Sequence, residues 1–145
     1  MARDPLPVLL RLRNIALDAA RRALADRLRE DSAAAERSAG IAATIARETA
    51  VQAGQPVERG TGEAYVAWLR SARGAQREAE AASRACTAAT AEARGSLNEA
   101  RTGSRALEAA LARAQHAARG AAARLEQQAV DEAAAGRKRP QRWSG

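Results

Sequence analysis

The chain has 145 residues, of which 46% are hydrophobic but only 2% aromatic, and it contains no Phe. The length suits one domain, but so little aromatic bulk excludes an ordinary globular core of that size. Ala supplies most of the apolar fraction. Because an Ala side chain buries little area, a compact fold built on it would not offset the conformational entropy lost on folding. The composition therefore predicts a single elongated, helical domain over residues 1–145.

The formal net charge is +7, with basic and acidic residues mixed along most of the sequence. Such mixing is typical of a solvated helix face. Nearly all basic residues are arginines, which a GC-rich genome explains. The exception to the mixing is a basic tail at residues 137–145, which contains Arg137, Lys138, Arg139 and Arg142.

Cysteine content and hydropathy predict the cellular compartment of the chain. The single cysteine cannot form an internal disulfide, which fits a reducing environment. No stretch approaches the roughly 20 apolar residues that a membrane span requires. The opening MARDPLPVLLRLR has charges on both sides of a short apolar run, unlike a signal peptide. We expect a soluble, cytoplasmic chain.

The first helix is predicted from about residue 7 to about residue 53, after Pro5 and Pro7. Its apolar residues follow coiled-coil spacing, in steps of seven, seven and four, at Leu10, Leu17, Leu24 and Leu28. Residues 53–62, AGQPVERGTG, hold three Gly and one Pro, which predicts a turn over about 54–61. Thr61 is expected to cap the next helix, with Glu63 in its first turn.

The second helix is predicted over about 62–136, and two rows of a seven-residue repeat run through it. One row is Leu69, Gln76, Ser83, Thr90, Leu97, Ser104, Leu111, Ala118, Leu125 and Glu132, and the other is Tyr65, Ala72, Ala79, Cys86, Ala93, Ala100, Leu107, Ala114, Ala121 and Gln128. The second row is mostly small, so the backbones of two supercoiled helices can approach closely. Single glycines off both rows each cost roughly 1 kcal/mol relative to Ala.

A short turn between two such helices makes an antiparallel hairpin, in which residues whose numbers sum to about 115 face each other. Large residues then meet in the pairs Leu10–Leu107, Leu17–Leu97, Leu28–Cys86 and Ile45–Leu69. The predicted fold class is thus all-α: a long two-helix antiparallel coiled-coil hairpin. The second helix overhangs the first by roughly 27 residues, or about 40 Å. Its apolar row persists there, so it either frays or buries itself against another molecule.

Residues with catalytic or metal-binding chemistry are few. His116 lies off both rows with no Cys or Asp cluster at metal spacing, and Cys86 occupies a row position that a small buried thiol fills. The glycines are scattered singly and form no phosphate-binding loop. We expect no catalytic, cofactor-binding or metal-binding residues, and therefore no enzyme.

Three segments carry a family resemblance: the opening LPVLLRLRNIALDAARRALADRLRED, the segment from Tyr65 to Leu69, YVAWL, and the ending ARLEQQAVDEAAAGRKR. They resemble the FliJ family, the stalk proteins of the flagellar type III export ATPase. The resemblance covers nearly the whole chain in length and layout. This sequence differs from the family in being richer in Ala and Gly and poorer in Leu.

The resemblance implies a cytoplasmic coiled coil, peripherally associated with the inner membrane at the export apparatus, that promotes flagellar protein export. The implied partners are the hexameric export ATPase, a membrane export-gate protein and export chaperones. The positions implied at the ATPase are Arg11, Arg13, Arg21, Arg22, Leu111, Ala118, Arg124 and Leu125. Those implied at the gate are Tyr65, Trp68 and Ala72. Trp68 lies one position off the row, where it either packs on a flank or docks a partner.

Other function classes remain open. A generic structural coiled coil or homodimerising adaptor would use the same overhang with a different partner. A basic nucleic-acid-binding helical protein is suggested by the charge and by the tail with Trp143, although acids interleave with the bases through both helices. A membrane-surface helix is suggested by LPVLLRLRNIAL and its arginines.

Overall fold

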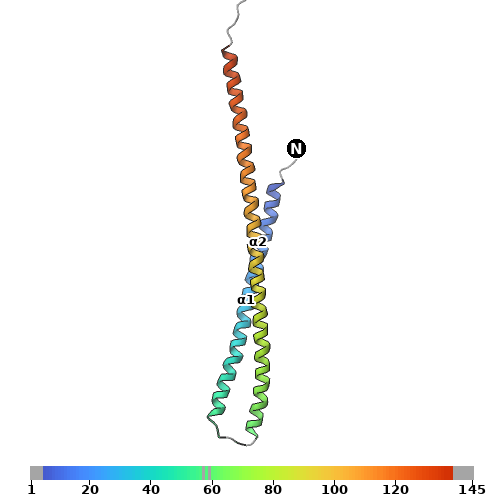
Figure 1. The fold of residues 1–145 in the computed structure, drawn as a ribbon, viewed down its shortest axis with the longest axis vertical. Coiled ribbons are helices and arrows are strands. Elements are labelled where there is room, and N and C mark those ends of the chain that lie inside the picture. Colours follow the sequence, from blue (N-terminus) through green and yellow to red (C-terminus); the bar gives the residue numbers. More distant parts are fainter. Residues whose placement is uncertain (1–4, 57, 59, 139–145) are drawn as a thin grey trace, which may run out of the picture. The chain divides into compact units, whose positions relative to one another are not determined.

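A computed structural model describes residues 5–56, 58 and 60–138. They form two long helices, α1 over Leu6–Ala53 (48 residues) and α2 over Thr61–Arg137 (77 residues), shown in Figure 1. The all-α fold with a longer second helix is confirmed, and the predicted helix bounds agree within one residue at each end. The predicted basic tail lies largely outside the described residues, including Arg139, Arg142 and Trp143.

The chain divides into two compact units. Unit 1 combines residues 1–14 with residues 102–145, and unit 2 is the continuous stretch 15–101. Unit 2 contains most of α1, the turn and the first part of α2. Unit 1 contains the start of α1 and the remainder of α2.

The first turn of each helix closes on the residue before it. In α1 the Leu9 N–H donates to the Pro5 carbonyl at 3.0 Å, and Pro7 is tolerated because a first-turn N–H has no partner within the helix. In α2 the Ala64 N–H donates to the Gly60 carbonyl at 3.3 Å. Gly60 has a φ of 101°, a conformation that glycine adopts without steric cost. The cap position is therefore Gly60, and the prediction of Thr61 was wrong by one residue.

Glycines inside α2 allow a test of helix stability. A Cβ added to Gly95 would meet nothing within 4 Å, so we expect Gly95→Ala to raise the free energy of unfolding by about 1 kcal/mol. Gly60 also has open space around it, but its positive φ disfavours a side chain, so Gly60→Ala should lower stability by about 1 kcal/mol. Urea unfolding of both variants checks the two signs. Destabilisation by Gly95→Ala would contradict the continuous helix.

In unit 2 both predicted rows of α2 face α1. Every row member in this unit is buried or half-buried, from Tyr65 to Ala100: Tyr65, Leu69, Ala72, Gln76, Ala79, Ser83, Cys86, Thr90, Ala93, Leu97 and Ala100. The most deeply buried are Thr90, Leu97 and Ala79, at 2%, 5% and 8% exposure. On α1 the buried residue is Ala34. Small side chains at the contact let the two helices lie close together.

Hydrogen bonds that cross between the helices of unit 2 report their register. Tyr65 Oη donates to Thr49 Oγ1 at 2.8 Å, near the turn. Thr87 Oγ1 lies 2.8 Å from Asp31 Oδ1, to which it donates, and Thr90 Oγ1 donates to the Arg27 carbonyl at 3.2 Å. The residue numbers of these pairs agree with the predicted sum to within about three, so the antiparallel register is confirmed.

One residue that the sequence placed at the helix contact is exposed instead. Leu28, predicted to meet Cys86, is 42% exposed. A further step of seven from Leu24 leads to Asp31, which is half-buried and bonded to Thr87. The prediction that Leu28 lies at the helix contact was wrong, because a step of four from Leu24 leaves the seven-residue repeat.

In unit 1 the start of α1 packs against the segment of α2 from residue 102 to residue 111. Ser104 is 3% exposed, and its Oγ donates to Asn14 Oδ1 at 2.9 Å. Leu10, Leu107 and Leu111 are half-buried. Beyond Leu111, the described residues of α2 are exposed apart from the half-buried Gly120. α1 therefore covers the rows of α2 as far as Leu111, about three residues farther than the sequence predicted.

Candidate functional site

The described residues contain no group of three or more His, Cys, Asp or Glu side chains that could hold a metal ion. His116 is exposed, and Cys86 is a half-buried free thiol. Within the same residues, no helix is both long enough and apolar enough to cross a bilayer. The sites predicted from the sequence are both partner-binding surfaces on the two helices.

The first surface is built around an aromatic pair near the turn of unit 2. Tyr65 and Trp68 stack with ring centroids 5.8 Å apart and an interplanar angle of 27°. Their i, i+3 spacing brings the rings together on the surface of one helix. The Tyr65 hydroxyl is tied to Thr49, so Tyr65 bridges the helices while Trp68 lies beside it, half-buried. The stacking of the two rings and the hydrogen bond from Tyr65 to Thr49 hold the aromatic pair in place.

Trp68 borders an open groove of about 460 Å³ between α1 and α2 of unit 2, which we call the aromatic groove. Its wall on α2 includes Trp68 and Ala72, and its wall on α1 includes Gly40 and Ile45. A Cβ on Gly40 would meet nothing within 4 Å, so the groove is wide at that point. The structure brings all three predicted gate residues together, Tyr65 beside Trp68 and Trp68 beside Ala72. Both readings of Trp68, flank packing and docking, are compatible with its half-buried position.

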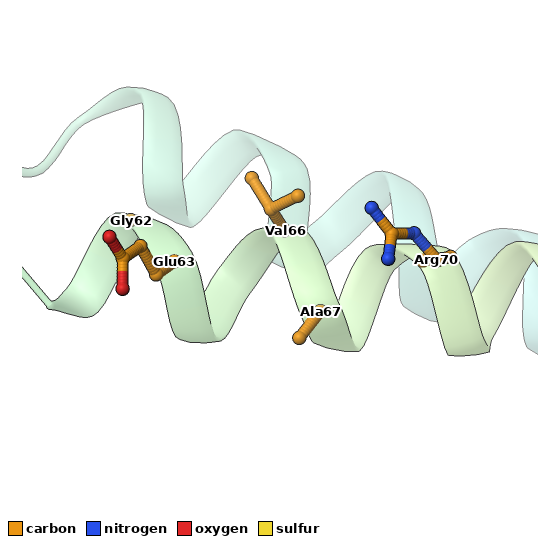
Figure 2. Close-up of a pocket in the computed structure, with 5 residues that line it drawn as sticks. All are labelled: Gly62, Glu63, Val66, Ala67 and Arg70. Atoms are coloured by element: carbon orange, nitrogen blue, oxygen red, sulfur yellow. The ribbon is translucent and has the colours of Figure 1, made fainter.

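Another hollow lies on a different side of the same stretch of α2. It measures about 350 Å³ and is lined by Gly62, Glu63, Val66, Ala67 and Arg70, as Figure 2 shows. Val66 is 53% exposed. It precedes Trp68 by two residues, which is about 200° around a helix. This hollow and the aromatic groove are therefore separate surfaces. Val66 could not be identified from the sequence, because the seven-residue repeat points only to the rows that face α1.

The second candidate surface is the exposed part of α2 in unit 1. Leu111 is half-buried, whereas Ala118, Arg124 and Leu125 are exposed, and Leu125 reaches 67% exposure. Arg124 Nε donates to the Gly120 carbonyl at 3.2 Å, so its guanidinium lies along the helix. The residues between Glu108 and Glu126 include three arginines and no acid. The surface combines an exposed apolar row with positive charge.

The four arginines of α1 predicted at the ATPase belong to different units. Arg11 and Arg13 lie in unit 1, and Arg21 and Arg22 lie in unit 2. All four are exposed. Arg21 pairs with Asp18 at 3.0 Å, an exposed ion pair of small energetic weight. Arg13 extends toward α2, with Nη1 3.2 Å from the position that a Cβ on Gly103 would occupy. Only Arg11 and Arg13 share a unit with the exposed part of α2.

Charge is distributed unevenly between the units. Unit 1 has 11 basic and 5 acidic residues, a net charge of +6. Unit 2 has 13 basic and 12 acidic residues, a net charge of +1, and together they give the +7 of the chain. Unit 1 therefore carries nearly all of the positive excess, which favours an acidic partner at that unit.

Comparison with known proteins gives no family for this chain. No protein-family model matches it, and searches of curated proteins and of solved structures found no significant match.

Proposed function

We propose that the chain is a non-enzymatic stalk component of the bacterial flagellar type III export apparatus. In this proposal it is cytoplasmic, associates peripherally with the inner membrane, and binds the hexameric export ATPase, the export gate and export chaperones. The chain has no catalytic role of its own. Its function is to couple these partners during export of flagellar proteins.

One observation carries the proposal: α2 of unit 1 keeps its heptad rows after Leu111, although nothing in the described residues covers them. A row that remains regular without a partner in the chain is expected to bury itself against another protein. The surrounding positive charge favours an acidic binding site. The residues proposed for the ATPase contact here are Leu111, Ala118, Arg124 and Leu125, with Arg11 and Arg13 from the same unit. Arg21 and Arg22 are proposed from unit 2.

Binding to purified hexameric flagellar export ATPase tests this contact, using two variants of the full chain. Leu125→Asp places a charge in the exposed row, and we expect it to weaken binding at least about tenfold, since a desolvated charge costs more than 1.4 kcal/mol. Val130→Asp is the matched control. Val130 is 61% exposed, like Leu125 at 67%, but lies about 140° around the helix.

The results separate the possible partners. Weakening by Leu125→Asp alone supports the stalk proposal. Equal binding by both variants, or no binding by the unchanged chain, overturns it. If sedimentation shows a homodimer that Leu125→Asp dissociates, and the ATPase does not bind, the row serves a second copy of the chain and the alternative coiled-coil adaptor is correct.

The proposed export-gate contact is the aromatic groove, with Tyr65, Trp68 and Ala72. We expect Trp68→Ala to keep the helical fold with a loss of about 1–2 kcal/mol in stability, because the side chain is only half-buried and loses one stacking contact. Flagellar export should nevertheless fall strongly in a complemented host strain. Val66→Ala, on the other side of α2, is the control and should leave export unchanged. Normal export with Trp68→Ala would mean that Trp68 packs on the flank of the helices and does not dock the export gate.

A further inference from the structure

The start of α1 exposes large apolar side chains that the helix contact does not use. Val8, Leu9 and Leu12 are 60%, 44% and 58% exposed, and we call them the apolar stripe. All three lie in unit 1, where Leu6 and Leu10 provide the half-buried contact. A cluster of exposed apolar residues on a protein surface commonly marks a binding site.

The stripe occupies one side of the helix. At 100° per residue, Val8 and Leu12 lie about 40° apart, and their mean direction is about 180° from Leu10. Leu9 extends the stripe along one edge. Val8 and Leu12 therefore point away from Leu10, and Leu9 lies between the two faces. All three are exposed, so a partner can reach the stripe without opening the fold.

The charge around the stripe is positive. Residues 5–17 contain Arg11 and Arg13 and no acidic residue, and unit 1 as a whole has a net charge of +6. Arg11 is exposed and lies about 60° around the helix from Val8, so it borders the stripe. Apolar residues on one side with Arg at the edge are typical of a helix that lies in a lipid interface. An Arg stem can follow the apolar surface while the guanidinium reaches a phosphate.

We propose that the apolar stripe inserts shallowly into the surface of an anionic bilayer, with Arg11 contacting lipid phosphates. A second copy is a poorer occupant, because it would bring two strongly positive units together. Nucleic acid is also disfavoured, because the stripe has no aromatic side chain for bases to stack on. Three side chains give weak, reversible binding that depends on lipid charge. The inference shares Arg11 with the proposed ATPase contact but does not depend on Leu125, so Leu125→Asp tests the two proposals separately.

Vesicle flotation of the full chain tests the proposal. The probes are vesicles of phosphatidylcholine alone and of phosphatidylcholine mixed equally with phosphatidylglycerol. Val8→Asp should lower partition into the anionic vesicles about tenfold. Val130→Asp is a matched control, because it makes the same substitution in the same unit at 61% exposure against 60%, and it should change partition less than about twofold.

A second variant tests the charge without touching the stripe. Arg11→Gln should lower partition into anionic vesicles about fivefold and leave partition into neutral vesicles unchanged. Because Arg11 is exposed and Gln is a good helix former, this variant keeps the fold and remains informative if Val8→Asp unfolds. Binding of the unchanged chain should weaken as salt is raised.

The outcomes are distinct. Loss with Val8→Asp and Arg11→Gln, and retention with Val130→Asp and Leu125→Asp, supports the lipid contact whether or not the ATPase binds. Failure of the unchanged chain to float, equal partition into neutral and anionic vesicles, or equal loss with Val8→Asp and Val130→Asp overturns it. A self-association that Val8→Asp abolishes, without flotation, would assign the stripe to a second copy and also overturn the proposal.

Discussion

Replacing Leu97 by Ala should destabilise the protein by about 2–4 kcal/mol, because a buried Leu→Ala change loses transfer free energy and leaves a cavity. Leu97 is 5% exposed, and it is the one large aliphatic side chain among the buried residues of the described chain. Its neighbours in the rows are mostly Ala and polar residues, which cannot expand to fill the space. Urea unfolding followed by circular dichroism gives the change in the free energy of unfolding.

Leu125→Ala is the internal control for this effect. Leu125 stands in the same heptad row of α2, four repeats later, but is 67% exposed. The same chemical change should alter the free energy of unfolding by less than about 0.5 kcal/mol. Similar losses at both positions would mean that the row is buried beyond Leu111 in the protein in solution, by self-association or otherwise.

Enlarging Ala79 should also destabilise unit 2, by about 1–3 kcal/mol, since overpacking forces the helices apart or the side chain off its rotamer. Ala79 is 8% exposed, in the row of small residues where α2 approaches α1. Ala79→Leu adds bulk at a position that is already almost fully covered. Thermal unfolding checks the loss of stability.

Ala81→Leu is the matched control for the overpacking variant. Ala81 lies two residues from Ala79, on an exposed side of α2, so the same bulk meets solvent. Its effect should stay within about 0.5 kcal/mol. Greater stability of Ala79→Leu than of the unchanged chain would show that the helices are too far apart at Ala79 for the small residues to be in contact.

The seven-residue repeat was the most reliable guide to this fold. It predicted the buried rows of α2 even where the residues are polar, as at Gln76, Ser83, Thr90 and Ser104. Position in the repeat outweighed side-chain type because the partner helix covers whatever occupies the inner face. Leu28 shows the converse: it was predicted at the contact because it is hydrophobic, but it lies outside the repeat and is exposed.

The cross-helix polar partners could not be predicted from the sequence. The hydrogen bond between Thr87 and Asp31 could not be predicted, because it depends on the axial register of the helices to within one residue. A turn with several glycines fixes the register only approximately. The division of net charge between units also depends on knowing which part of α2 packs against the start of α1. The segment LPVLLRLRNIAL suggested a membrane-surface helix, but the exposure of Val8 within it, like that of Val66, depends on which faces pack.

The small size of the buried side chains has a thermodynamic consequence. The buried residues of the described chain are Ala34, Ala79, Thr90, Leu97 and Ser104, so unfolding transfers little apolar surface to water. The heat capacity of unfolding and the denaturant m-value both scale with that surface. Per residue, both quantities should lie below those of a globular domain, and stability should change gradually with temperature. Most side chains are already exposed to solvent in the folded helices. Fraying of a helix end therefore changes the hydrated surface area only slightly.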